Sequence, residues 1–228
     1  MNEVDVDVFI KFGEETYMKS LYEKGEIYMG TIDEYKYHKN PQIGDEYENL
    51  KYIWQIPKAN LKLSVNNIDE ITIPDAMGHF LVHSDDKGNL FCLFSVKANE
   101  FIRNEDNNTF ELDLKIYKDF GDCACIIYKP KTFIDLIDKR LNDKGHICKK
   151  KLVKYYDPYV YNGPLDIFWK RNKYIHQKEA RIHVNNEMNE HIIFEIGSLE
   201  NIALFKSNLD DKIRIESTET HLIFSRNE

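Results

Sequence analysis

Alternating apolar and polar side chains open the chain. In residues 4–12 the apolar positions recur at every second residue, which is the period of a β-strand with one buried face. Gly13 ends this pattern, and Glu14–Lys24 then has the apolar spacing of a helix, followed by a glycine suited to a left-handed cap. The side chains predicted to face inward from this helix are Tyr17, Met18, Leu21 and Tyr22. A second strand is predicted at Glu26–Ile32, so the chain begins as strand–helix–strand.

The middle of the chain consists of short apolar runs separated by polar connections. Residues 31–50 are polar and rich in tyrosine, and their Asn-Pro and Gly-Asp pairs indicate a loop. The short strands predicted next, spaced as in a meander, are Tyr52–Ile56, Leu61–Val65 and Glu70–Ile73. His79–Ser84 and Leu90–Val96 flank the turn sequence DDKGN and predict a hairpin. Residues 99–110 are polar and predict a surface loop.

The last part of the chain returns to longer apolar runs. These predict a buried strand at Cys123–Tyr128, a helix from Pro130 to about Asn142, and a strand with a basic edge at Ile147–Tyr156. Further predicted elements are a short helix at Leu165–Ile175, a hairpin of Arg181–Val184 with Ile192–Ile196, and late strands at residues 213–217 and 221–225. No repeat, low-complexity tract or change of composition marks a linker. We therefore expect residues 1–228 to form one α+β domain with a mostly antiparallel β-sheet core and a few helices.

Charge and composition narrow the class of protein. The formal net charge of −8 argues against a general binder of phosphate backbones, whose surface is broadly basic. The 14 Tyr and 13 Phe residues predict a substantial core. No apolar run reaches the roughly 20 residues of a membrane helix, and the acidic start MNEVDVDVF is unlike a signal peptide. We expect a cytoplasmic protein with no membrane partner and with reduced cysteines.

Several familiar kinds of chemistry lack their motif. No G-x-S-x-G, P-loop or G-x-G-x-x-G sequence occurs, which excludes the hydrolases, nucleoside triphosphatases and Rossmann enzymes that carry them. The four candidate zinc ligands, Cys123, Cys125, His146 and Cys148, have C-x-C and H-x-C spacings that differ from those of zinc sites, so we expect no metal there. Two groups of carboxylates, one at Asp45, Glu46 and Glu48 and one at Asp5 and Asp7, fit either Mg²⁺ binding or a solvated acidic surface.

The densest polar stretch is Phe168–Val184, with the sequence FWKRNKYIHQKEARIHV. Gln177 and Glu179 stand two residues apart at the head of a predicted strand, so their side chains are expected on the same face, with Lys178 on the other. A carboxylate held beside a cleft can stabilise the positive charge that develops as a glycosidic bond breaks. The alternative is a surface network of ion pairs among Lys178, Glu179 and Arg181.

Several stretches together resemble a bacterial family known as the DUF2971-like group. They are FIKFGEETYMKSLYEKGEIYMGTIDEYK, IGDEYEN, FCLFSV, FGDCACIIYKPKTFID, FWKRNKYIHQKEARI and IGSLENIA, and they extend from about residue 9 to residue 203. More distantly, the layout is similar to the ADP-ribosyltransferase fold, which has a split sheet. In that fold the first strand carries an Arg or His and a late strand begins with a catalytic Glu. Lys11 stands at the first position here, and Glu179 matches the second.

This second similarity implies an NAD-dependent enzyme. It makes Glu179 and Gln177 the catalytic pair, with Gln177 positioning the acceptor, and it places NAD between the first strands and residues 168–179. The cofactor-binding residues that it implies are Lys11 or Arg171 at the pyrophosphate, Tyr28 and Tyr35 on the nicotinamide, and Ser95 on a middle strand. Asp45, Glu48, Tyr174 and Arg181 are expected to complete the pocket.

The resemblance implies transfer of ADP-ribose from NAD to a protein or nucleic-acid acceptor, in a bacterial toxin or an anti-phage defence system. A first alternative is a non-catalytic module that binds a nucleotide or nucleic acid through stacking tyrosines and the basic runs 149–151 and 170–173. A second alternative is a protein–protein interaction component whose cleft has no activity.

Overall fold

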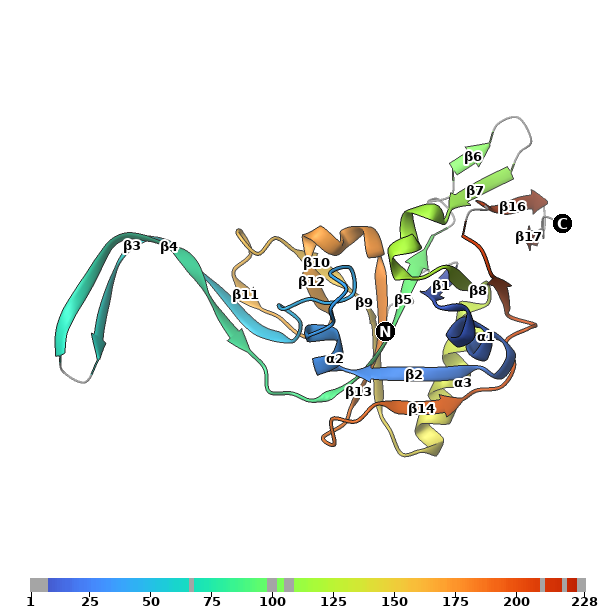
Figure 1. Cartoon of the computed structure of the whole chain (residues 1–228), viewed down its shortest axis with the longest axis horizontal. Coiled ribbons are helices and arrows are strands. Elements are labelled where there is room, and N and C mark those ends of the chain that lie inside the picture. The colour runs from blue at the N-terminus through green and yellow to red at the C-terminus, as the bar shows by residue number, and fades with distance from the viewer. Residues whose placement is uncertain are drawn as a thin grey trace.

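An eight-stranded sheet lies at the centre of the protein (Figure 1). The computed structural model describes residues 8–65, 68–97, 102–104, 109–209, 212–218 and 221–224. The strands of the central sheet are β1 (Val8–Gly13), β2 (Glu26–Thr31), β5 (Gly88–Val96), β8 (Cys123–Ile127), β9 (Cys148–Leu152), β13 (Glu179–Asn185), β14 (Ile192–Glu195) and β15 (Ala203–Lys206). Their order is β14-β2-β5-β1-β8-β15, with β13 also beside β5 and β9 beside β13, and each described pairing is antiparallel. The predicted α+β class with mainly antiparallel sheets is confirmed.

The central sheet divides along one edge of β5. β2 pairs with the start of β5, at Asn89 and Leu90, whereas β1 pairs with its end, from Phe94 to Val96. Between these two segments, no strand of the described chain pairs with this edge, so β1 and β2 diverge. On the opposite edge, β13 pairs with β5 from Gly88 to Phe94. The divergence brings side chains of β1, β2 and β5 around one opening.

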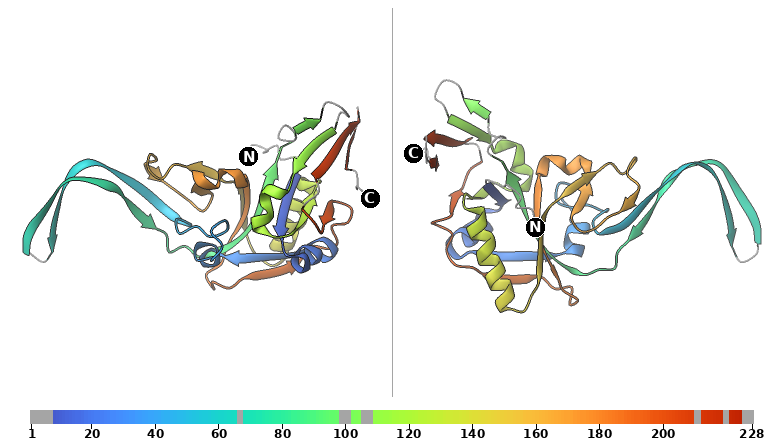
Figure 2. Two further views of the ribbon diagram at one scale, coloured as in Figure 1. Left: turned by 45° about the horizontal axis from the view of Figure 1, so that its top comes forward. Right: turned by 180° about the vertical axis from the view of Figure 1, so that it is seen from behind.

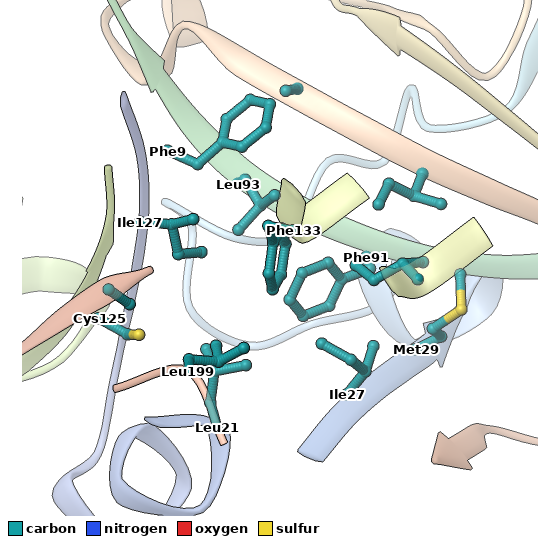
Figure 3. Close-up of a cluster of buried hydrophobic side chains, with 14 of the residues drawn as sticks. Phe9, Leu21, Ile27, Met29, Phe91, Leu93, Cys125, Ile127, Phe133 and Leu199 are labelled. Carbon is teal, nitrogen blue, oxygen red and sulfur yellow. The ribbon is translucent and has the colours of Figure 1, made fainter. Parts of the chain in front are cut away.

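Two helices cover one face of the sheet, α1 (Glu15–Lys24) and α3 (Pro130–Asp143). Figure 3 shows Phe133 of α3 among the apolar side chains of β1, β2, β5 and β8. The buried residues of the two helices are Met18, Leu21, Phe133, Ile137 and Leu141, at the spacing that the sequence predicts. Tyr17 was expected inward but is 62% exposed, because it lies on the solvent side of α1. Gly25 ends α1 with φ of 65°, as expected of a glycine cap.

Strand β1 is covered on both faces rather than on the one face that its alternating pattern predicts. Phe9 packs into the core beneath the helices, whereas Val8, Ile10 and Phe12 pack into a second apolar cluster on the other side. The second cluster includes Tyr117 of the 3₁₀ segment η2 (Lys115–Phe120). The predicted start of the strand, with Asp5 and Asp7, lies outside the described residues.

A long hairpin projects from the body as an arm, visible in every view of Figures 1 and 2. Its strands are β3 (Leu50–Val65) and β4 (Ile68–His83), of 16 residues each. The short strand β11 (Gly163–Pro164) pairs with β3 at Tyr52 and Ile53, near the base of the arm. Residues 50–83 therefore do not form the predicted meander of three short strands.

Prolines account for this error. Pro57 and Pro74 interrupt the apolar pattern, and each lies where the pairing of β3 with β4 shifts its register. A shift of register accommodates a residue that has no N–H to donate. The predicted hairpin across DDKGN is also wrong, because β4 pairs with β3, whereas β5 belongs to the central sheet.

The remaining elements are α2 (Ile32–Lys36), β6 (Ile102–Asn104), β7 (Thr109–Asp113), β10 (Lys154–Tyr156), β12 (Trp169–Arg171), η3 (Asn172–Gln177), β16 (Lys212–Thr218) and β17 (His221–Phe224). They revise several loops and one helix of the sequence prediction, whereas β10, β16 and β17 lie where strands are predicted. The predicted loop at 31–50 thus contains the helix α2, and strands occupy described parts of the predicted loop at 99–110. The predicted helix at Leu165–Ile175 is instead β12 followed by η3.

The predicted hairpin between Arg181–Val184 and Ile192–Ile196 does not form. β13 pairs with β5 and β9, whereas β14 pairs with β2 on the far side of the sheet. Asn89, near the start of β5, donates from Nδ2 to the carbonyls of Met29 and Glu190 and so ties this crossing segment to β2. No helix within the described ranges has the length and apolar character needed to cross a bilayer.

Candidate functional site

A pocket of about 740 Å³ opens where β1 and β2 diverge along β5. Its walls come from these three strands, from α2 and the connection after it, and from β12, η3 and β13. The polar side chains at its surface include Lys11, Tyr28, Glu34, Tyr35, Lys170, Gln177, Glu179 and Arg181. Aromatic side chains line it as well, among them Phe12, Phe94 and Phe120. Segments far apart in the sequence therefore contribute to one cavity.

Glu179, the first residue of β13, is 5% exposed and accepts several hydrogen bonds. Arg181 donates from Nε to Glu179 Oε1 at 2.6 Å, and Lys170 donates from Nζ to Oε2 at 2.9 Å. Burial alone would raise the pKa of this carboxyl, but the charges of Arg181 and Lys170 outweigh it and hold the pKa well below its usual range. Glu179 is therefore an ionised carboxylate across the physiological pH range.

Arg181 joins this carboxylate to a second one. Its Nη1 and Nη2 donate to Glu48 Oε1 and Oε2 at 2.6 and 2.9 Å, and Nη1 also donates to the carbonyl of Ile167. The side chains of Arg181 and Glu48 are each 1% exposed. Two buried cations, Arg181 and Lys170, thus balance two buried anions, Glu48 and Glu179. Such a cluster is stable only while its members remain paired.

Gln177 is fixed at both ends of its amide. Lys170 Nζ donates to Gln177 Oε1 at 2.8 Å, and Gln177 Nε2 donates to the carbonyl of Gln42 at 2.7 Å. Gln177 and Glu179 both line the pocket, whereas Lys178 between them is exposed and has a positive φ of 42°. The predicted sharing of a face by Gln177 and Glu179 is confirmed, although the backbone reaches it through the end of η3 rather than within a strand.

Lys11 reaches the pocket from β1. Its Nζ donates to the carbonyl of Cys92 at 2.8 Å and lies 4.9 Å from the centre of the Phe91 ring. Burial lowers the pKa of this ammonium group, although the nearby Cys92 and Glu179 partly oppose the effect. Within the described residues no carboxylate forms an ion pair with Lys11. A positive charge in this position favours an anionic ligand group.

The two predicted stacking tyrosines both line the pocket, in different settings. Tyr28 is 45% exposed, its ring stacks on His191, and its hydroxyl donates to Glu34 Oε1 at 2.7 Å. Burial and this hydrogen bond raise the pKa of Tyr28 to about 12. Tyr35 lies deeper and donates to the carbonyl of Leu90 at 3.3 Å. Glu34 completes the capping box of α2 with Thr31, so the helix that the sequence prediction missed positions both tyrosines.

Four predicted pocket residues lie behind the wall instead of on it. Arg171 forms an ion pair with Asp45 at 2.5 Å, and Tyr174 donates its hydroxyl hydrogen to the carbonyl of Gly44 at 2.7 Å. Together with Glu48, these contacts hold residues 40–48 against β12 and η3. Burial would lower the pKa of Arg171, but Asp45 raises it above its ordinary value. These residues position the site and are not in the lining of the pocket.

Ser95 also supports the site from outside the pocket. Its backbone N–H and its hydroxyl both donate to the carbonyl of Lys178, at 2.9 and 2.5 Å. This fixes the turn between Gln177 and Glu179 against β5. The hydroxyl is already committed to that carbonyl, so a direct contact with a ligand has no support in this geometry.

The metal candidates of the sequence lie apart from the pocket. Cys123 and Cys125 are buried in β8, and Cys148 donates to Asp138 Oδ1 at 3.1 Å. In the part of the chain that the structure describes, no group of three or more His, Cys, Asp or Glu side chains is arranged to hold a metal. The acidic run at 45–48 is instead paired with Arg171 and Arg181.

Lys170 is the main site residue that the sequence reasoning missed. It is 4% exposed, yet its ammonium group contacts Gln177 and Glu179 and lies 4.6 Å from the centre of the Tyr174 ring. The sequence contained a signal, because Lys170 belongs to the same polar run, but a lysine in such a run is ordinarily solvated. No comparable sequence pattern identified the other pocket residues Cys92, Glu34 and Gln42.

Comparison with protein-family models, with curated proteins and with solved structures gives no match to this chain. The resemblances to the DUF2971-like group and to the ADP-ribosyltransferase fold therefore remain predictions, and the pocket itself provides the basis for proposing a function.

Proposed function

We propose that this protein is an NAD-dependent ADP-ribosyltransferase whose reaction takes place in the pocket at the split of the sheet. The observation that carries the proposal is the meeting of Lys11, Tyr35, Gln177 and Glu179 in one cavity, although they come from opposite ends of the sequence. Solvation of surface charges does not explain such convergence, since Gln177 and Glu179 are buried.

The chemical groups around the pocket match the parts of NAD. The volume of about 740 Å³ lies in the range of ligand pockets, roughly 300–1,000 Å³. Lys11 offers a cation to the pyrophosphate as a point charge. Tyr28 and Tyr35 offer aromatic surface to the nicotinamide ring, and Glu179 offers a carboxylate to the adjoining ribose.

Glu179 supplies the electrostatic part of the mechanism. In the transfer, the bond between ribose C1′ and the nicotinamide nitrogen breaks, and its electron pair leaves with nicotinamide. The acceptor then forms a bond to C1′ and releases a proton. The positive charge that develops on the ribose is stabilised by an ionised carboxylate in a site of low dielectric constant. The fixed amide of Gln177 lies on the same side and is suited to orient an acceptor.

Release of nicotinamide from labelled NAD⁺ tests this proposal. We expect Glu179→Gln, which preserves the shape of the side chain, to lower the rate by about 100-fold or more, as removal of a transition-state stabiliser does. Glu195→Gln, at an exposed position of β14, is the matched control and should retain the wild-type rate. Thermal unfolding of both variants shows whether a loss of rate reflects a loss of folding. Absence of nicotinamide release from the wild-type protein with any protein or nucleic-acid acceptor, or equal rates in both variants, contradicts the proposal.

One observation favours a second candidate, a module that binds a nucleotide without turnover. The carboxylate of Glu179 already accepts three N–H donors, from Arg181 Nε and Nη2 and from Lys170 Nζ. A carboxylate so occupied has little acceptor capacity left for a ribose hydroxyl. This candidate predicts that NAD⁺ and ADP-ribose raise the melting temperature of the protein equally, without release of nicotinamide. Lys11→Met should abolish the shift, and a shift that persists in that variant counts against both functions.

A further inference from the structure

A second cavity, of about 350 Å³, lies farther along the same face of β13. Side chains alternate along a strand, so Glu179, Arg181, His183 and Asn185 share one face. The first two line the pocket described above, whereas His183 and Asn185 line the second cavity. The hydrogen bond of Arg181 to the carbonyl of Ile167 lies at the boundary between the two cavities, because Arg181 lines the first and Ile167 lines the second.

His183 lines this second cavity with a buried ring that has no hydrogen-bond partner among the described residues. It is 8% exposed, and its ring meets the ring of Phe168 edge to face at 6.3 Å. Burial, with help from Lys149 and Arg181, lowers the pKa of His183 to about 4. The ring is therefore neutral near pH 7 and has one N–H donor and one nitrogen acceptor without protein partners. Such a group in a cavity calls for a ligand or a solvent molecule.

The backbone leaves room for this imidazole. A Cβ atom added to Gly88 would lie 2.6 Å from His183 Nε2 and 2.6 Å from the carbonyl oxygen of Val184. Gly88 does not have a positive φ, so the turn geometry alone does not require glycine there. The glycine instead permits β5 to approach the ring of His183 closely.

Four lysines surround the cavity, Lys51, Lys87, Lys149 and Lys151. Lys149 lies directly opposite His183 in the pairing of β9 with β13, so the two side chains share a face. Three carboxylates are present as well, from Asp86, Asp166 and Glu187. That of Asp166 already accepts the N–H of Phe168 at 2.8 Å and lies 3.9 Å from Lys151. The cavity thus carries more positive than negative charge in a chain whose net charge is −8.

We propose that this second cavity binds a phosphate group, held by the N–H of His183 and by the ammonium groups of Lys149 and its neighbouring lysines. A tetrahedral dianion can accept from several donors at once, which suits a ring of lysines around a neutral histidine. A metal ion is a poor alternative, because the described residues contain no cluster of three or more suitable ligands. The proposal is independent of NAD chemistry in the first pocket.

The occupant is either free phosphate or the phosphate of a mononucleotide, and a titration of the whole chain distinguishes them. Inorganic phosphate and AMP are added separately at constant ionic strength, while the ring signals of the 8 histidines are followed by NMR. The signal that disappears in His183→Gln identifies His183. We expect this signal to move in a saturable manner and its pKa to rise from about 4, because a bound anion stabilises the protonated ring. Tighter binding of AMP than of phosphate identifies a nucleotide occupant, and equal binding identifies free phosphate.

Two substitutions test the donors. Binding to the variants is measured by isothermal titration calorimetry, because His183→Gln lacks the His183 ring signal. Lys149 is exposed, so Lys149→Gln should fold normally and weaken binding about 3- to 10-fold, and His183→Gln should weaken it about 10-fold. Lys144→Gln, an exposed lysine at the end of α3 outside the cavity, is the matched control and should bind as wild type does. The proposal is overturned if phosphate and AMP leave the His183 signal unmoved, or if both variants bind phosphate as tightly as wild type does. It is also overturned if Lys11→Met abolishes binding, because the phosphate then lies in the first pocket.

Discussion

The pocket in the body and the exposed face of the arm each invert the usual distribution of polar and apolar groups. At the pocket, Arg181 and Glu48 have side chains that are each 1% exposed. On the arm, by contrast, Trp54 is 60% exposed and Phe80 is 56% exposed, although the two residues are direct partners across β3 and β4. Charges are therefore buried in one region, whereas aromatic rings face solvent in the other.

The difference lies in the partners of each group. The pocket cluster consists of the four buried charges Arg181, Lys170, Glu48 and Glu179. Each of them has an opposite charge within hydrogen-bonding distance, so the loss of one leaves another uncompensated. Trp54 and Phe80 lie on the face of the hairpin opposite to Ile53 and Leu81, which pack against the body. Truncation of Trp54 or Phe80 therefore removes few packing contacts among the described residues. The two regions should consequently respond to substitution in opposite ways.

The largest effect is expected from Arg181→Met. The substitution leaves the carboxylates of Glu48 and Glu179 buried without their shared cation, and it should lower the free energy of unfolding by about 3–5 kcal/mol. Denaturation in urea measures the change. The control is Lys19→Met, which removes an exposed ion pair with Glu15 on α1 and should leave stability nearly unchanged. Equal losses in the two variants would contradict the cooperative pairing of the pocket cluster.

The second effect concerns pH and His183. The folded-state pKa of about 4 lies below the ordinary value of 6.5, so the unfolded chain binds a proton first as the pH falls. The stabilising contribution is therefore complete above pH 6.5 and is lost between pH 6.5 and about 4. Over this range wild type should lose about 2–3 kcal/mol more than His183→Gln does, as measured by urea denaturation at each pH. Parallel pH profiles would show that the ring is not held neutral by its surroundings.

A matched pair of glycine substitutions compares the two regions directly. A Cβ at Gly88 meets His183 and the backbone of Val184, whereas a Cβ at Gly78 on the arm meets nothing within 4 Å. We expect Gly88→Ala to lower the free energy of unfolding by about 1–3 kcal/mol, through the strain of overpacking. Gly78→Ala should change it little or raise it slightly, since alanine restricts the unfolded chain. A neutral Gly88→Ala would mean that β13 can move away from β5 without cost.

The sequence allowed prediction of the elements whose signal is local. The helices α1 and α3 and the strand β8 follow from apolar spacing and from Gly25 and Pro130 at their ends. The same reasoning located Gln177 and Glu179 on one face. It missed α2 because the surrounding polar run suggested a loop, although Thr31 and Glu34 had the spacing of a capping box.

A local sequence pattern could not predict which distant strands and side chains pair with one another. Two apolar runs separated by a turn predicted a hairpin between residues 79–84 and β5, yet β5 pairs with β1, β2 and β13. The burial of Lys170 and Arg181 depends on which carboxylates the fold brings near them, and Glu48 lies 133 positions away from Arg181 in the chain. A charge run gives no indication of such a partner, so the site residues were recognised more readily than their roles.

The smallest effect is expected on the exposed face of the arm. Trp54→Thr and Phe80→Thr each remove an exposed ring and one cross-strand contact, and each should lower the free energy of unfolding by less than about 1 kcal/mol. Ile53→Ala is the matched control on the same strand, where the side chain is fully buried against Tyr156 and should cost about 2–5 kcal/mol.

Urea denaturation at several protein concentrations makes the comparison decisive. If the exposed face is free in solution, both threonine variants unfold close to wild type at every concentration. If Trp54→Thr instead costs as much as Ile53→Ala, and only at high concentration, the face is covered by a second molecule. The aromatic rings of the arm would then face solvent only in the isolated chain, because association would bury them as fully as the fold buries the charges of the pocket.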